Sequence, residues 1–259
     1  MSTLTTPHID VHRGGDRMKT RVSWLDSKHS FSFGEHYDPD NTHHGLLLVN
    51  NEDIVSPGQG FETHPHRDME IVTWVLGGSL VHQDSLGHSG VIYPGLAQRM
   101  SAGTGILHSE KNDSWRLDRG TEHDAPVHFV QMWVVPDEPG LEPGYQQLEI
   151  DDELARGGLV TVASGLPRYR DRTAIAIGSS HSAMHVARLA GGETEQDIDL
   201  PDAPYLHLFV ARGEVEMEGV GPLYAGDAVR LTRSGGQRVV AHGPAEILVW
   251  EMHARLGSS

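Results

Sequence analysis

The stretch GFETHPHRDMEIVTWVLGG, residues 60–78, determines which fold we predict. Its second half, EIVTWVL (70–76), is rich in β-branched and aromatic residues, and the chain continues through Gly77 and Gly78 into SLVHQ (79–83). Two glycines between two such runs supply the positive φ angles that a tight turn needs. We therefore predict a hairpin of two antiparallel strands that turns at these glycines.

The same pattern occurs twice in the chain, at offsets of 135 and 131 residues. VLGGSLVH (75–82) and YPGLAQRMSAG (93–103) correspond to VARGEVEM (210–217) and YAGDAVRLTRSGG (224–236). Each copy reads strand, Gly-containing turn, strand, loop, Tyr-x-Gly, strand and Gly-rich turn. Because helical periodicity is almost absent, we predict an all-β chain with two β-barrels of related design.

The Pro- and Gly-rich stretch PDEPGLEPGY (136–145) begins the predicted connection between the barrels. We place the approximate boundary there, with an N-terminal metal-binding domain over residues 1–136 and a C-terminal domain over residues 137–259.

Composition excludes several classes of function. The formal charge of −16 argues against nucleic acid or an anionic membrane as the main partner, because both require a cationic face. No cysteine is present, so imidazole and carboxylate are the strong metal ligands available. The start, MSTLTTPHID, lacks the pattern of a secretory signal, and no apolar run approaches the roughly 20 residues needed to span a bilayer. We expect a soluble cytoplasmic protein.

Residues spaced two apart form the candidate site. His64 and His66 project to one side of a strand, as do His108 and Glu110 in SAGTGILHSEKN (101–112). A single His-x-His pair is often only exposed and polar, whereas two facing pairs inside a barrel would offer three imidazole nitrogens and one carboxylate oxygen. That ligand set suits Fe(II), Mn(II), Ni(II), Cu(II) or Zn(II) and selects none of them.

Two known motifs coincide with these pairs. From Gly58 to Gly77 the chain reads G-x5-H-x-H-x3-E-x6-G, which matches the first cupin motif at every position. The second cupin motif, P-x-G-x2-H-x3-N, fails only at its proline, where this chain has Gly103; it is met by Gly105, His108 and Asn112.

Longer segments, FSFGEHYDPD, HQDSLGHSGVIYPG and QRMSAGTGILHSEKN among them, closely resemble the pirin family over roughly residues 10–136. The second half is similar, more weakly, to the C-terminal cupin of the bacterial pirin-like quercetin 2,3-dioxygenases. The resemblance implies a bicupin, two cupin barrels in one chain. It also implies one metal, usually iron, with the ligands His64, His66, His108 and Glu110.

The fourth ligand requires a choice between two glutamates. Many cupins use the glutamate of the first motif, here Glu70, whereas pirins use the one that follows the second-motif histidine, here Glu110. We favour Glu110 because the pirin resemblance extends far beyond the cupin core. Glu70 and Glu62 then have a supporting role.

We expect one metal ion per chain. The repeat offsets relate each of the four candidate ligands to one residue of the second barrel. These residues do not form a set of metal ligands; they are Asp199, Pro201, Val239 and Ala241.

The resemblance implies an enzyme that opens the flavonol ring of quercetin-like substrates with dioxygen and releases carbon monoxide. Glu110, with Glu70 as the alternative, would accept the flavonol hydroxyl proton. Candidate pocket residues, which core packing explains equally well, are Phe61, Trp74, Met100 and Met132.

The alternative is an iron-binding regulatory protein, for which the acidic charge allows a basic protein partner. A third interpretation is a β fold stabilised by a metal ion with a purely structural role.

Overall fold

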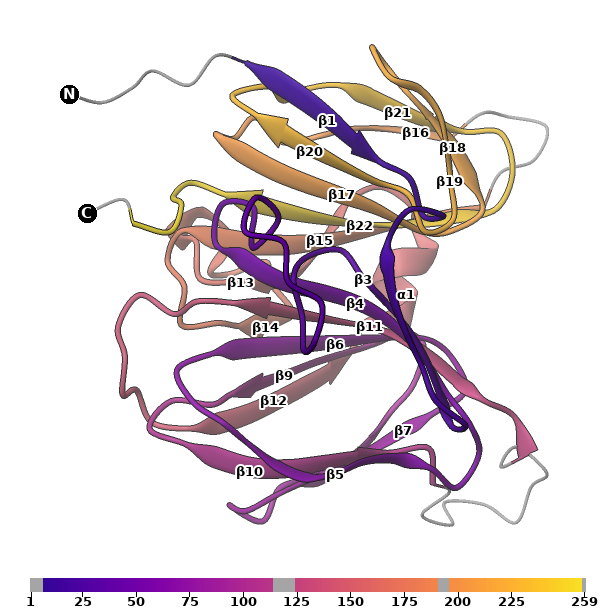
Figure 1. Cartoon of the computed structure of the whole chain (residues 1–259). Helices are drawn as coiled ribbons and strands as arrows, with labels where there is room; N and C mark the ends of the chain where they lie inside the picture. Colours follow the sequence, from indigo (N-terminus) through magenta and orange to yellow (C-terminus); the bar gives the residue numbers. More distant parts are fainter. Residues whose placement is uncertain (1–6, 114–123, 191–195, 258–259) are drawn as a thin grey trace.

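The computed structural model describes residues 7–113, 124–190 and 196–257 of the 259-residue chain. Regular structure is almost entirely β-strand, arranged in four sheets. Each barrel combines one seven-stranded and one four-stranded sheet, and the two barrels lie one above the other in Figure 1. The predicted all-β bicupin fold is confirmed.

The first barrel contains the candidate ligands. Its seven-stranded sheet has the spatial order β12 (Gly144–Glu149), β9 (Leu96–Ser101), β6 (Glu70–Gly77), β11 (Val127–Val134), β4 (Leu47–Val55), β3 (Leu25–His29) and β2 (Met18–Arg21). Its four-stranded sheet has the order β5 (Gly60–His66), β10 (Ile106–Lys111), β7 (Leu80–Asp84) and β8 (Ser89–Ile92).

The second barrel repeats this plan. Its large sheet runs β1 (His8–His12), β20 (Ala228–Thr232), β17 (Tyr205–Arg212), β22 (Ala245–Met252), β15 (Ser182–Leu189), β13 (Val160–Ser164) and β14 (Ile175–Ala176). Its small sheet runs β16 (Gln196–Asp199), β21 (Arg238–Ala241), β18 (Glu214–Met217) and β19 (Gly221–Tyr224). The helix α1 (Asp151–Ala155) and the 3-10 helix η2 (Pro167–Tyr169) are short. No helix of the described residues is long and apolar enough to cross a membrane.

The predicted hairpin at Gly77 and Gly78 is wrong. β6 belongs to the large sheet and β7 to the small one, so the turn takes the chain from one sheet to the other. Gly78 has a φ of 73°, and a Cβ atom there would lie 3.0 Å from the backbone of Val127. The glycine is therefore required by both conformation and space.

Each barrel includes a strand from the other half of the chain. β1 pairs with β20 of the second barrel, where Figure 1 shows it in indigo beside orange and yellow strands. β12, which follows residue 137, pairs with β9 of the first barrel. The boundary at 136/137 stays a prediction, and strand pairing crosses it in these two places.

The two large sheets pack face to face through an apolar layer, which we call the seam. Alternate residues of β6 face this layer, namely Val72, Trp74 and Leu76. From the second barrel they meet fully buried side chains that include Phe209, Leu248 and Trp250. Trp74 also donates its Nε1 hydrogen to Glu246 at 2.6 Å, so the one polar atom of this indole is satisfied inside the seam.

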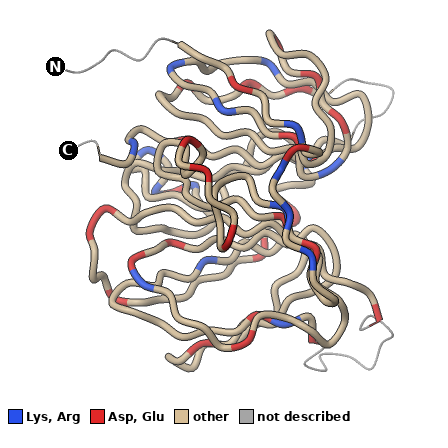
Figure 2. The backbone as a smooth tube through the Cα atoms, in the orientation of Figure 1, with Lys and Arg blue, Asp and Glu red and all other residues tan. Residues whose placement is uncertain are grey.

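The interiors of the two barrels differ in polarity. The second barrel is filled by one continuous apolar cluster that includes Leu208, Val239 and Ile247. The first has two separate apolar clusters, one around Phe129 and one around Met100. A row of buried polar residues crosses the first barrel, whereas the second buries a smaller polar group that includes His185 and Glu251. Figure 2 shows Lys and Arg spread over both barrels and interleaved with Asp and Glu.

The seam also contains a histidine that lowers stability in acid. His207 is fully buried, and neither ring nitrogen has a partner among the described residues. Burial, together with the nearby Arg230, lowers its pKa well below 6.5. When the pH falls below 6.5, the unfolded chain takes up a proton at this residue while the folded chain does not, so stability is lost.

We therefore expect the free energy of unfolding of the wild type, relative to a His207→Gln variant, to decrease between pH 7 and pH 5. Urea denaturation of both metal-free proteins at several pH values measures the difference between their free energies of unfolding. The contributions of all other titrating groups cancel in this difference. A difference that is constant with pH would contradict the assignment of the acid sensitivity to His207.

Candidate metal centre

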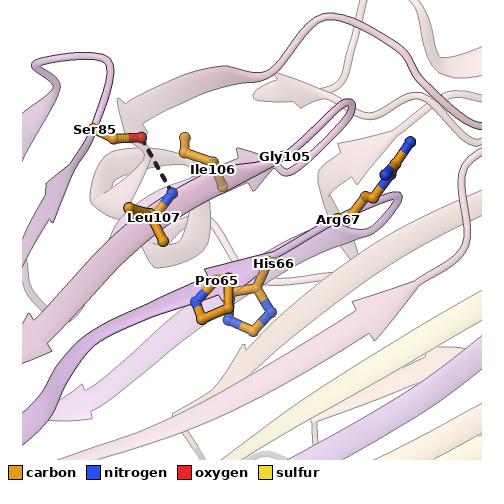
Figure 3. A pocket seen from close by; sticks show the side chains of 7 residues that line it. All are labelled: Pro65, His66, Arg67, Ser85, Gly105, Ile106 and Leu107. Atoms are coloured by element: carbon orange, nitrogen blue, oxygen red, sulfur yellow. Dashed lines mark hydrogen bonds between the residues drawn. The ribbon is translucent and has the colours of Figure 1, made fainter.

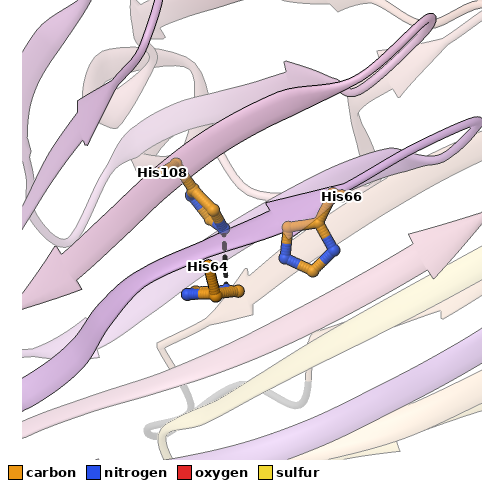
Figure 4. Close-up of side chains that lie close together, drawn as sticks. All are labelled: His64, His66 and His108. Carbon is orange, nitrogen blue, oxygen red and sulfur yellow. Dashed lines mark hydrogen bonds between the residues drawn. The ribbon is translucent and has the colours of Figure 1, made fainter.

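Three histidines converge inside the first barrel. β5 and β10 are antiparallel neighbours in which His108 lies opposite His64, and His66 follows on the same side of β5. The three ring centroids are 4.5–4.9 Å apart, and the Nε2 atoms of His64 and His108 are separated by 3.1 Å (Figure 4).

The free nitrogen atoms of these rings fit a metal ion. The Nδ1 atom of His64 donates its hydrogen to the carbonyl oxygen of Glu62 at 2.7 Å, which leaves a lone pair on Nε2. The Nε2 atom of His66 is buried and has no partner among the described residues. Two nitrogens bound at right angles to one ion lie about 3 Å apart, for metal–nitrogen distances near 2.1 Å. The measured 3.1 Å agrees with that spacing.

Electrostatics keep the rings of His66 and His108 neutral. Burial, followed by the neighbouring imidazoles of His64 and His82, lowers the pKa of His108 to about 3. Burial, followed by the charges of His108 and His64, lowers the pKa of His66 to about 4. Near neutral pH both rings therefore present lone pairs, the form in which imidazole binds metals.

Glu110 lies next to this group without joining it. It shares the buried face of β10 with His108, as predicted. The ligand atoms of the three histidines lie within 4.8 Å of one another, whereas Glu110 is grouped at that distance with His82 and His108. The predicted ligands thus fall into two overlapping groups that share His108, and the complete set of four stays a prediction.

A row of buried polar side chains crosses the inner face of the large sheet opposite the histidines. Cross-strand pairing links its members, which are Gln98, Thr73, Gln131, Asn51 and His29. Gln131 donates Nε2–H to Glu110 Oε2 at 2.7 Å, and Thr73 donates its hydroxyl to Oε1 at 3.4 Å. This row holds the Glu110 carboxylate toward the large sheet.

The other acidic candidates point elsewhere. The pairing register of β5 shifts between Phe61 and His64, and Glu62 is exposed and bonded to Lys111 at 2.8 Å. Glu70 lies on the face of β6 that is turned to the seam, where it accepts a hydrogen bond from Ser101 at 2.7 Å. Neither carboxylate belongs to a group of potential metal ligands among the described residues.

His82 is the site residue that motif spacing missed. It is fully buried on β7, opposite Glu110 of β10, and its Nδ1 atom is 3.5 Å from the Nδ1 atom of His108. The one sequence signal was its alternation with Asp84 in VHQD (81–84). That signal lies outside both cupin motifs.

The second barrel carries apolar residues at the matching positions. Val239 lies opposite Ile198 in the second barrel, and His108 lies opposite His64 in the first. Because Val239 corresponds to His108, the counterpart of His64 is Ile198. The predicted counterpart, Asp199, is wrong by one residue. Both residues are buried in the apolar core of that barrel.

Aromatic side chains surround the histidines on two sides. The ring of Trp133 lies edge-on to His66 at 4.8 Å, and Phe61 lies 6.3 Å from His64. Of the predicted pocket residues, Phe61 alone has a ring contact with one of the three histidines, His64, among the described residues. Trp74 and Met132 face the seam, and Met100 belongs to an internal cluster.

A hollow of about 450 Å³ lies where β5 ends and β10 begins (Figure 3). It is lined by Pro65, His66, Arg67, Ser85, Gly105, Ile106 and Leu107. His66 is the one member of the histidine group among these residues, so the hollow adjoins the group at a single histidine.

Comparisons with known proteins agree with this architecture. A family model described as Pirin matches residues 12–134. A Mycobacterium tuberculosis protein named "Putative quercetin 2,3-dioxygenase Rv0181c" is 60% identical and covers 98% of this chain and 99% of its own. The Escherichia coli "Quercetin 2,3-dioxygenase" is 35% identical over 94% of this chain and 98% of its own.

One of the similar solved structures was determined with a metal ion. The crystal structure of the bacterial pirin YhhW from Escherichia coli, determined in complex with nickel(II), has a TM-score of 0.81 and 31% sequence identity. It covers 95% of this chain and 100% of its own. The side chains described above fit a single transition-metal ion.

We expect the His64→Ala and His108→Ala variants to lose stoichiometric metal binding while the β fold is retained. Elemental analysis after metal loading, with circular dichroism alongside, measures both properties. Normal metal content in both variants would contradict the site.

The two glutamates offer a matched pair of substitutions. Glu110→Gln should weaken metal binding, whereas Glu70→Gln should leave it unchanged because Glu70 faces the seam. The opposite ranking, in a chelator competition assay, would identify Glu70 as the ligand.

Proposed function

Because this chain belongs to the pirin family, we propose that it is a metal-dependent dioxygenase that opens the flavonol ring of quercetin-like substrates with dioxygen and releases carbon monoxide. The proposed ion is Fe(II), held by His64, His66 and His108 with Glu110 as fourth ligand. The names of the two relatives and the convergence of three imidazoles support the proposal.

The incomplete coordination shell of the three imidazoles is the main support for an enzyme. With Glu110 as fourth ligand, an octahedral ion would still have two coordination positions open to water, substrate or dioxygen. A structural ion is normally enclosed by protein ligands alone, whereas a catalytic ion keeps open positions. When bound, the ion would act as a Lewis acid that favours the 3-hydroxylate form of the flavonol.

Glu110 would accept the proton of the flavonol 3-hydroxyl group. Its carboxylate is buried, and Gln131 and Thr73 hold it in place by hydrogen bonds. A carboxylate oriented in this way can take a proton from a hydroxyl group bound beside it.

Trp133 and Phe61 would bind the flat rings of the substrate. Trp133 lies edge-on to His66 and Phe61 lies near His64, and both side chains are partly buried. Aromatic side chains favour edge-to-face and offset contacts with other rings. They would also limit the access of water to the reacting centre.

Oxygen uptake on addition of quercetin tests the proposal. The Fe(II)-loaded protein should consume dioxygen and release carbon monoxide at catalytic turnover, and the His64→Ala variant should do neither. Loading with Mn(II), Ni(II) and Cu(II) extends the test to the other metals that suit the ligand set. If a fully loaded protein is inactive with all four metals, the enzyme proposal fails and the regulatory alternative takes its place.

Substitution of Trp133 tests substrate binding separately. In an active enzyme, Trp133→Ala should raise KM for quercetin by roughly 2- to 10-fold, which corresponds to the 0.5–1.5 kcal/mol of an aromatic pair. Tyr224→Ala, which removes an exposed ring from the second barrel, is the matched control and should leave KM unchanged. Equal KM values for wild type and Trp133→Ala would remove Trp133 from the substrate pocket.

A further inference from the structure

A chain of buried polar side chains leads away from the metal centre on the side opposite His64. The Nδ1 atom of His108 lies 3.5 Å from Nδ1 of His82, and the Nε2 atom of His82 lies 3.3 Å from Asp84 Oδ2. The side chains of His82 and Asp84 are fully buried. The Tyr145 ring stacks on His82 at 4.7 Å and an angle of 28°, which fixes the plane of the imidazole.

The hydrogen-bond partners of Asp84 keep it an acceptor. Its Oδ1 atom accepts the backbone N–H groups of Leu86 at 2.9 Å and His88 at 3.0 Å. Its Oδ2 atom accepts Nδ1–H of His88 at 2.9 Å as well as the contact from His82. A carboxylate surrounded by four donors has no hydrogen of its own to give.

The positions of the hydrogens then follow in order. Because Asp84 accepts, the Nε2 atom of His82 carries the hydrogen, which leaves the lone pair of the ring on Nδ1. That lone pair faces Nδ1 of His108 at 3.5 Å and favours a hydrogen on this atom. The lone pair of His108 is then on Nε2, which lies 3.1 Å from the lone pair on Nε2 of His64, so an ion is needed between the two. Without an ion, Nε2 of His108 would instead carry a hydrogen and donate it to His64.

This order decides between the two groups of potential ligands. An ion held by His82, His108 and Glu110 would require the lone pair of His108 on Nδ1, whereas an ion held with His64 and His66 requires it on Nε2. The two arrangements need opposite tautomers of His108, so one neutral ring cannot serve both. Asp84, acting through His82, selects the second.

We propose that Asp84 and His82 are positioning residues, which set the tautomer of His108 so that its Nε2 atom faces the ion held with His64 and His66. Carboxylate partners of metal-bound histidines commonly have this role, and here an additional imidazole extends the connection. The inference rests on the metal site of the proposed function and does not depend on the flavonol reaction.

The first measurement requires no substitution. In Zn(II)-loaded protein labelled with 15N-histidine, long-range 1H–15N correlation spectra distinguish a His108 ring bound through Nε2, with its hydrogen on Nδ1, from one bound through Nδ1, with its hydrogen on Nε2. We expect the Nδ1–H form. Observation of the Nε2–H form would overturn the inference.

Asp84→Asn supplies the second measurement. The amide oxygen should stay with the two backbone N–H groups, which places the NH2 group toward His82 and reverses the donor order along the chain. The hydrogen of His82 would then point at Nδ1 of His108, and we expect the affinity for Ni(II), measured by chelator competition, to fall by roughly 10- to 100-fold. Wild-type affinity in this variant would contradict the proposal.

Asp10→Asn is the matched control. It makes the same exchange at a carboxylate beside another histidine, because Asp10 Oδ2 lies 2.7 Å from His12 Nε2 on β1 of the second barrel. Its Ni(II) affinity should equal that of the wild type. A loss equal to that of Asp84→Asn would assign the effect to the loss of any carboxylate and overturn the proposal. An absence of quercetin turnover, with these binding results intact, would reject the proposed reaction alone.

Discussion

The alternation of side chains along β6 is the constraint on which both the fold and the site depend. Val72 and Trp74 enter the seam, while Ile71, Thr73 and Val75 enter the barrel. A slip of one residue would exchange these faces, placing an indole in the barrel and a hydroxyl group between two apolar sheets. Seam packing thus determines the register that lines up the polar row beside Glu110.

The sequence contained enough information for the class of fold and for the three histidines. His64, His66 and His108 lie on two regular stretches of strand, where a spacing of two residues places side chains on one face. Glu62 and Glu70 could not be placed in this way, because the register shift in β5 and the positive φ of Asp68 interrupt the alternation. Both interruptions depend on how the chain pairs with its neighbours.

His82 and Trp133 show a second limit of sequence patterns. Each meets the histidine group through contacts between strands that are distant in the sequence, and spacing along one strand carries no information about such contacts. The turn at Gly78 is similar, since a glycine turn looks alike whether the next strand pairs with the previous one or crosses to another sheet. The crossing is what encloses the site between two sheets.

The exchanged strands β1 and β12 have a consequence for biosynthesis. β1 is made first, but its partner β20 lies near the other end of the chain and emerges from the ribosome only after both barrels are almost complete. At the usual 5–20 residues per second, that interval lasts roughly 10 to 40 seconds. During this time β1 has no native partner strand, whereas β12 finds β9 soon after it emerges. The first barrel can therefore close during translation, while the second closes only near its end.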